Sequence, residues 1–272
     1  MGKRNVVHGT PIAATDATTR DRISARRAVQ TFEPMLAQFL SQVEVFYVTG
    51  DTCYTDGKRI FISDKFAKAH PRGGVFAMYH ELWHIAFGHL PIYKALEGKP
   101  WEHELHNILA DAKINEQARH RINFTDNEWS KYKNIIRVDN VCQILSGNLR
   151  KGWEEALKDI PITDTSRAFA ALRPFVYKSF GPGPGGHIPL EGIGELGDGF
   201  DEATQRDIES KVAASIEAAK MRGATGGSLE SELEDIWLKK QVPWARIIAQ
   251  AVLSRFKKEK TWSKLARKTY YM

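Results

Sequence analysis

The segment from Gly73 to Gly88 constrains the fold most, because it is strongly apolar yet carries three ionisable side chains. It opens on a Gly-Gly pair and is stopped by Gly88 and Pro91, which predicts a single helix of about four turns. A helix this apolar is expected to be buried. The protein must therefore hold His80, Glu81 and His84 in its interior and satisfy their polar atoms there.

These three residues form an HExxH motif within VFAMYHELWHIAFGH. On a helix, positions i and i+4 lie about 40° apart around the axis, so both imidazoles can bind one zinc ion. Glu81 lies beside them, where its carboxylate can take a proton from a zinc-activated water. The alternative is a chance match, with two ordinary histidines on a buried helix. We favour the metal, because these three groups at one buried place are costly without an ion.

A catalytic zinc site usually has three protein ligands and a water, so a third ligand is needed. His89 lies nine positions after His80 and would point about 180° away from it on a continuous helix. It would reach the metal only if the chain turned sharply at Gly88. The metzincin spacing HExxHxxGxxH is not met either. We therefore interpret His89 as a residue at the helix end or behind the ligands.

A second helix, predicted from about Trp101 to His120, offers a better third ligand. It carries one narrow polar stripe at positions i, i+3, i+7 and i+11, made of Glu104, Asn107, Asp111 and Asn115. Apolar side chains surround this stripe, so its polar groups need partners in the interior. We predict that Asp111 is the third zinc ligand and that Asn107 and Asn115 orient the ligands. The alternative is a solvated helix face.

The rest of the pattern is mostly helical, with one small sheet. Strands are predicted over residues 43–49 and in a hairpin at 53–62, which turns at Asp56-Gly57. Further helices are predicted over residues 20–41, 138–149, 153–157, 201–221, 229–240 and 243–257. The fold class is therefore α+β, mainly helical with a small antiparallel sheet. We expect a flexible arm over residues 1–20 and one domain over 21–272 with a Gly/Pro-rich loop at 181–199.

Composition excludes several classes of protein. Hydrophobic residues make up 42% of the chain and charged residues 26%, which is typical of a globular protein. No apolar run reaches the roughly 18 residues of a membrane span, and the N-terminus lacks the apolar core of a secretory signal. We therefore expect a cytoplasmic protein without a membrane partner. Cys53 and Cys142 form no CxxC pair, which excludes a disulfide framework and a cysteine-rich zinc site.

The C-terminal segment from Arg255 to Lys268 supports a rival hypothesis. It interleaves basic and aromatic residues, a mixture that can bind nucleic acid, and the net charge of the chain is +6. The rival is a non-catalytic, metal-stabilised adaptor that binds nucleic acid through this segment. A structural zinc site needs no glutamate at Glu81 and usually has four protein ligands. We therefore favour an enzyme with a solvated basic segment, and we do not expect nucleic acid as a partner.

A family resemblance is carried by HELWHIAFGHL and the following HNILADAKIN. They resemble the HExxHxxxGH and WNIAADxxIN motifs of bacterial and phage zinc metallopeptidase-type proteins, often fused to a C-terminal von Willebrand factor A-like domain. His106 stands where the family has tryptophan. Residues 55–62 are similar to the family's TDGxxLYY hairpin, and parts of 226–263 resemble its closing segment. The resemblance spans roughly residues 30–120 and 222–270, which correspond to the catalytic-type domain alone.

The resemblance implies a zincin-like fold and a zinc site of the HExxH-plus-Asp type. Zn²⁺ would be held by His80, His84 and Asp111, with Glu81 as the catalytic base. The implied activity is that of a zinc metalloendopeptidase, and its partner is a peptide or protein substrate.

The zincin comparison suggests roles for other segments. In zincins an edge strand lies above the active-site helix and pairs with an extended substrate. Lys58–Ile62 and Cys53–Thr55 are the candidates for that strand. Tyr93, His103 and His187 are candidates for the group that stabilises the transition state. His187 lies in the 181–199 loop, which is either a lid or an unstructured insert.

Overall fold

The structure is a computed structural model of the 272-residue chain. It describes residues 10–13, 16–96, 99–133, 135–176, 202–223, 231–233 and 236. The chain divides into two compact units, residues 1–226 and 227–272, and every element described below belongs to the first. The Gly/Pro-rich loop at 181–199 and the helix predicted at 243–257 lie outside the described residues, as does the basic segment 255–268. Of the helix predicted at 229–240, residues 231–233 and 236 are described and are helical, and the others lie outside the described residues.

A proline divides the first helical segment into two. Helix α1 spans Asp16–Phe32 and α2 spans Ala37–Gln42, where the apolar spacing predicted one helix over residues 20–41. Pro34 has no N–H to donate and restricts the backbone of the residue before it, so α1 ends at Phe32. The helix also begins earlier than expected, which shortens the predicted flexible arm.

The sheet has three strands, β1 (Glu44–Val48), β2 (Tyr54–Thr55) and β3 (Arg59–Ser63), in the order β1-β3-β2. Strands β2 and β3 form the predicted antiparallel hairpin. Strand β1 runs parallel to β3, so the sheet is mixed and the prediction of a purely antiparallel sheet is wrong. Residues 49–53 connect β1 to β2 past the end of β3, where the Ser63 hydroxyl donates to the Gly50 carbonyl at 2.7 Å.

The two outer strands of the sheet are β1 and β2. Residues 10–12 lie along β1, and the Ile12 N–H donates to the Tyr47 carbonyl at 2.8 Å, so this part of the expected flexible arm is paired. Lys58–Ile62 coincides with β3, whose two edges are both paired, so its prediction as an edge strand is wrong. Strand β2 is the other outer strand of the sheet, and the predicted segment Cys53–Thr55 contains it.

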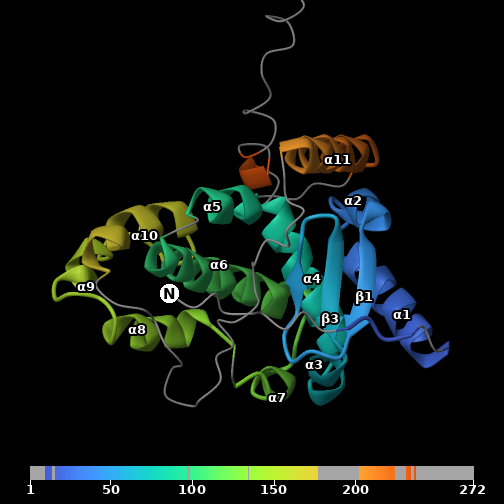
Figure 1. The fold of residues 1–272 in the computed structure, drawn as a ribbon, viewed down its shortest axis with the longest axis horizontal. Coiled ribbons are helices and arrows are strands. Elements are labelled where there is room, and N and C mark those ends of the chain that lie inside the picture. Colours follow the sequence, from blue (N-terminus) through green and yellow to red (C-terminus); the bar gives the residue numbers. More distant parts are fainter. Residues whose placement is uncertain are drawn as a thin grey trace, which may run out of the picture. The chain divides into compact units, whose positions relative to one another are not determined.

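Helix α4, Gly73–Ala86, is the predicted HExxH helix and is buried from Phe76 onward. It contacts β2, β3 and α1, together with α3 (Asp64–Ala69) and α6 (Pro100–Arg121), as Figure 1 shows. Its first turn approaches α3 so closely that a Cβ on Gly73 would lie 2.8 Å from two backbone carbonyl oxygens. Only glycine fits at this position, which explains Gly73, the first residue of the Gly-Gly pair.

Helix α6 packs an apolar face against a cluster that follows it in the chain. The cluster includes side chains of α8 (Val138–Ser146), α9 (Trp153–Ala156) and α10 (Thr165–Leu172). From α6 it takes Leu105, Ile108, Leu109 and Ala112. The α6 side chains outside this face include the polar stripe, and α6 also contacts α4. A helix packed on both sides can thus carry a polar stripe that is shielded from solvent.

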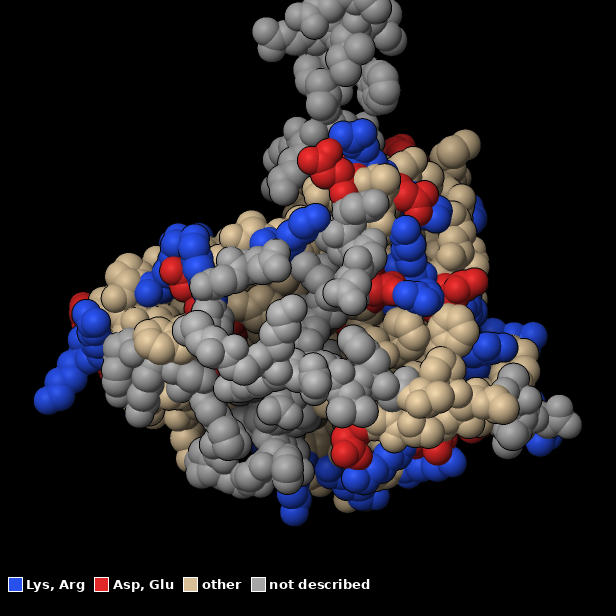
Figure 2. Space-filling model, viewed as in Figure 1, with Lys and Arg blue, Asp and Glu red and all other residues tan. Residues whose placement is uncertain are grey.

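The remaining elements are α5 (His89–Ala95), α7 (Asp126–Trp129), a 3₁₀ turn (Arg173–Phe175) and α11 (Glu202–Met221). Helix α11 packs on α2, and basic and acidic side chains lie close together over it (Figure 2). Within the described ranges, no helix combines the length and the apolar character needed to cross a bilayer.

Glu33 is a buried carboxylate just after α1, with 2% of its surface exposed. The Tyr79 hydroxyl donates to it at 3.4 Å, and the Arg121 guanidinium lies 3.9 Å away. Burial raises the pKa of Glu33 to about 7, although the Arg121 charge and the Tyr79 hydrogen bond act to lower it. The ionised carboxylate therefore destabilises the fold at neutral pH.

We expect Glu33→Gln to remove one pH dependence of stability. The folded-state pKa exceeds the unfolded value, so this contribution to stability is complete below about pH 4.5 and is lost as pH rises through about 7. At pH 8 the variant should gain up to about 3 kcal/mol over wild type, and little at pH 4. Urea unfolding of both proteins at the two pH values measures the difference. A difference that does not change with pH would contradict the prediction.

Candidate metal centre

Three possible metal ligands converge between α4 and α6. His80 and His84 come from successive turns of α4, and Asp111 comes from the middle of α6; all three are buried. The His84 Nε2 atom lies 2.9 Å from His80 Nε2 and 3.0 Å from Asp111 Oδ1. His80 Nε2 lies 3.5 Å from the same oxygen. The structure therefore brings together the three residues predicted as ligands, and their binding of zinc stays a prediction.

The donor atoms of this cluster fit a divalent cation. Burial alone would raise the pKa of Asp111, but hydrogen bonds from His80 and His84 hold it below its usual value, so its oxygen carries no proton. A proton on His84 Nε2 cannot point at both the carboxylate and the His80 nitrogen. One cation satisfies all three atoms. Ligand atoms around tetrahedral zinc lie roughly 3.3–3.4 Å apart, close to the 2.9–3.5 Å found here.

The two imidazoles differ in their electrostatic surroundings. Burial lowers the pKa of both rings. For His80 the hydrogen bond and charge of Asp111, with the charge of Glu81, outweigh burial and raise the pKa. For His84 burial prevails and the pKa is lowered. His84 therefore favours the neutral form that a metal ligand requires.

Glu81 lies beside the cluster with only 1% of its surface exposed. Neither of its carboxylate oxygens has a hydrogen-bond partner in the described part of the chain. Burial raises the pKa of Glu81 to about 8; the His80 charge acts to lower it and the Asp111 charge to raise it. A buried carboxylate without a partner is costly, so this group calls for an explanation outside the packing of the fold.

Asn115, a residue of the predicted polar stripe, contacts His80 at its Nδ1 atom. Its Oδ1 atom lies 2.7 Å from His80 Nδ1, and its Nδ2 donates to the Ile136 carbonyl at 2.7 Å. An amide oxygen accepts a proton from Nδ1, which leaves the lone pair on Nε2 for an ion. Asn115 thus connects His80 to the chain that precedes α8.

A sharp turn places α5 behind His84. Gly88 takes a left-handed conformation with φ 66° between α4 and α5. This turn brings His89 back, so that its Nδ1 lies 3.1 Å from His84 Nδ1. His89 therefore lies behind the cluster, on the Nδ1 side of His84. Burial, with nearby cationic charges, holds its pKa well below the usual value, and its neutral ring can accept the His84 proton.

Tyr93 and Asn107 extend this support to the third ligand. The Tyr93 hydroxyl lies 3.3 Å from His84 Nδ1 and donates to Asn107 Oδ1 at 2.7 Å. Asn107 in turn donates from Nδ2 to Asp111 Oδ2 at 3.5 Å. Both predicted orienting asparagines therefore contact the predicted ligands.

The chain was also compared with known proteins. Residues 17–130 match a family model described as "Putative metallopeptidase domain". This confirms the resemblance to a metallopeptidase family over that segment, which contains α4 and α6 and hence the whole cluster. No curated protein and no solved structure matches the chain.

Other candidates lie outside the cluster of possible metal ligands. The His103 ring packs at a tilt of 52° against the Tyr93 ring, with centroids 4.6 Å apart. His106 packs edge-on against Tyr93 and His89, and burial lowers its pKa to about 4, so it is neutral. Glu104 is half-buried at the start of the stripe. His187 lies outside the described residues.

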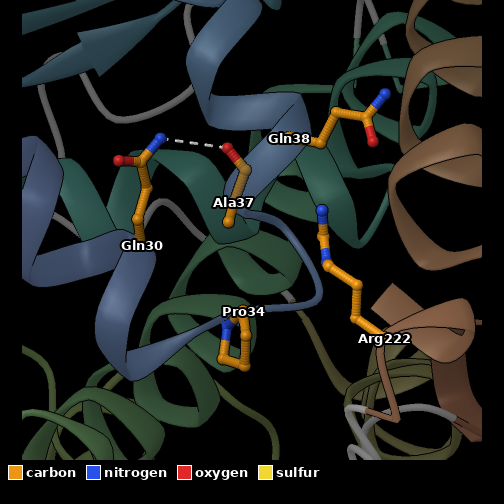
Figure 3. A pocket seen from close by; sticks show the side chains of 5 residues that line it. All are labelled: Gln30, Pro34, Ala37, Gln38 and Arg222. Carbon is orange, nitrogen blue, oxygen red and sulfur yellow. Dashed lines mark hydrogen bonds between the residues drawn. The ribbon is translucent and has the colours of Figure 1, made fainter. Parts of the chain in front are cut away.

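A pocket of about 490 Å³ lies apart from these residues. It is lined by side chains of α1 and α2, the loop between them and the chain just after α11: Gln30, Pro34, Ala37, Gln38 and Arg222 (Figure 3). Gln30 donates across it to the Ala37 carbonyl at 3.1 Å. No residue of α4 or α6 lines it, so it is not a substrate site for the metal cluster.

Proposed function

We propose that this chain is a zinc-dependent endopeptidase. The observation that carries the proposal is Glu81, a buried carboxylate with no hydrogen-bond partner among the described residues, next to three converging ligand atoms. A site that only stabilised the fold would gain nothing from this unpaired group. The match of residues 17–130 to a metallopeptidase family supports the same reaction class.

His80, His84 and Asp111 would hold the metal. Two imidazoles and one carboxylate that leave a fourth position open are typical of catalytic zinc. Zinc bound there would supply Lewis-acid chemistry, which polarises a carbonyl and acidifies water.

Glu81 would move the protons of the reaction. Its carboxylate would accept a proton from the attacking water and then donate it to the leaving amine, so that a neutral product departs. The ionised form is needed for the first step, and a divalent cation nearby would favour that form over the protonated one. The burial of Glu81 keeps bulk water from competing for the same proton.

We place the substrate backbone along β2. Tyr54–Thr55 is an outer strand of the sheet and contacts α4, the helix that carries His80, Glu81 and His84, so we propose that an extended peptide pairs with it there. The thiols of Cys53 and Cys142 are both free, which suits the reducing conditions of the cytoplasm that we propose as the site of action.

Metal removal and replacement test the proposed activity. We expect wild-type protein to cleave members of a broad peptide library, to stop after dialysis against a chelator, and to recover with about one equivalent of Zn²⁺. Mass spectrometry of the library detects cleavage, and elemental analysis measures bound metal. Cleavage that survives complete metal removal would contradict the proposal. A protein that binds one zinc yet cleaves nothing would favour the metal-stabilised adaptor.

A further inference from the structure

We propose that Tyr93 is a positioning residue that holds His84 and Asp111 in one arrangement and does not touch the substrate. The inference rests on the metal site of the proposed function and assigns a role to a residue on α5, outside both ligand helices. Its basis is a closed ring of contacts through four buried side chains, described next.

The ring joins three helices. It runs from Tyr93 on α5 to Asn107 on α6, at 2.7 Å, and from Asn107 to Asp111 Oδ2, at 3.5 Å. Asp111 Oδ1 then contacts His84 Nε2 on α4 at 3.0 Å, and His84 Nδ1 returns to the Tyr93 hydroxyl at 3.3 Å. All four side chains are buried, so water does not compete for these contacts.

Proton direction gives the ring its function. If Tyr93 donates its only proton to the Asn107 oxygen, its own oxygen is free to accept the Nδ1 proton of His84. Asn107 donates to Asp111 Oδ2. The donors of His84, Tyr93 and Asn107 then each have an acceptor in the ring, and these three hydrogen bonds leave His84 Nε2 and Asp111 Oδ1 unused. These are the two atoms that face each other at the proposed metal position.

The position of the Tyr93 hydroxyl excludes direct contact with a substrate at the metal. It contacts His84 at Nδ1, whereas the atom shared with His80 and Asp111 is Nε2, on the other side of the imidazole. The hydroxyl therefore lies on the far side of the His84 imidazole from the proposed metal position. Tyr93 was a candidate for transition-state stabilisation in the sequence, and this geometry assigns it to ligand positioning.

The turn at Gly88 makes the arrangement possible. With φ 66°, this residue starts α5 in a direction that brings His89 and Tyr93, four positions apart on one helix face, against the same nitrogen of His84. A side chain at Gly88 would be strained in this conformation. Helix α5 thus provides two acceptors for one proton, and Tyr93 alone carries the link onward to Asn107.

Tyr93→Phe tests the proposal, with Tyr132→Phe as the matched control. Tyr132 is also fully buried, and its hydroxyl donates to the Pro71 carbonyl at 2.6 Å. Tyr132→Phe therefore also removes a buried tyrosine hydrogen bond, but one that does not involve the possible metal ligands. We expect Tyr93→Phe to weaken zinc affinity by about 10- to 100-fold and Tyr132→Phe to leave it unchanged. Competition with a chelator of known affinity measures the effect. The visible spectrum of the Co²⁺-substituted protein should change only in Tyr93→Phe.

A double-mutant cycle gives an independent test of the ring. Asn107→Leu interrupts the same ring, so combining it with Tyr93→Phe should weaken zinc affinity by clearly less than the product of the two single effects. Fully additive effects would overturn the ring. Unchanged zinc affinity in Tyr93→Phe would overturn the proposal, and a fall in kcat at saturating zinc would then assign the hydroxyl to the transition state. Zinc affinity is measured without substrate. A wild type that binds zinc but cleaves no peptide would therefore contradict the proposed function and leave the role of Tyr93 in zinc binding open to the same test.

Discussion

Glu81→Gln should lower the kcat of peptide hydrolysis by about 10²- to 10⁴-fold while the protein keeps its fold and about one equivalent of zinc. Glutamine has nearly the shape of glutamate but cannot accept a proton from water at neutral pH. Glu81 makes no hydrogen bond to His80, His84 or Asp111, so its replacement leaves the ligand atoms in place. Initial rates on a library-derived peptide, together with elemental analysis of the same sample, measure both effects.

Glu33→Gln is the matched control for this variant. It changes another buried glutamate of the same unit, which contacts Tyr79 and Arg121 and has no contact with the three possible ligands. Its kcat should equal that of wild type although its stability at pH 8 differs. If Glu81→Gln retained full activity with zinc bound, Glu81 would not be the base and the proposed proton transfer would be wrong.

Asp111→Asn should weaken zinc binding by more than about 100-fold, the upper end of the effect seen for residues that only support a ligand. The substitution keeps the shape of the side chain but removes the one negative charge among the three possible ligands. An amide oxygen is a weaker ligand, and it no longer balances the charge of the ion. Chelator competition measures the affinity, and Asp111→Ala should have an equal or larger effect.

Asp56→Asn provides the control for charge removal. Asp56 is also buried, but it accepts from backbone N–H groups of Lys58 and Arg59 in the β2–β3 turn, on a different element from the cluster. Its replacement should lower the free energy of unfolding and leave zinc affinity unchanged. Equal loss of zinc from both variants would mean that Asp111 acts through the fold and is not a ligand.

Local patterns predicted the elements that carry the candidate site. The apolar run after Gly73-Gly74 predicted α4, and the observed helix Gly73–Ala86 ends two residues before the predicted stop. The second helix was predicted from about Trp101 to His120 and spans Pro100–Arg121. These predictions succeed because helical periodicity and Gly or Pro at the helix ends are properties of neighbouring residues. The signal for the break between α1 and α2, Pro34, is also local, but the sequence analysis predicted one continuous helix there.

Contacts between distant segments were predicted less well. The spacing placed Asn107, Asp111 and Asn115 on one face of α6, but only the packing shows that Asp111 and Asn115 contact His80 and His84. The parallel pairing of β1 with β3 was missed, because strand pairing depends on how the connection crosses the sheet and not on the strand residues themselves. The support from Tyr93 was missed as well, although its spacing of four from His89 was a readable signal.

The sequence by itself determined the two helices α4 and α6, which of their faces are apolar, and which of their side chains are able to bind a metal. Each of these follows from periodicity, which acts over a few residues. Only the tertiary structure decided that the polar stripe of α6 faces α4 and that Gly88 turns α5 behind His84. It also decided that Glu81 is left without a partner among the described residues. These features depend on how separate helices pack, and packing is decided by the whole buried surface at once.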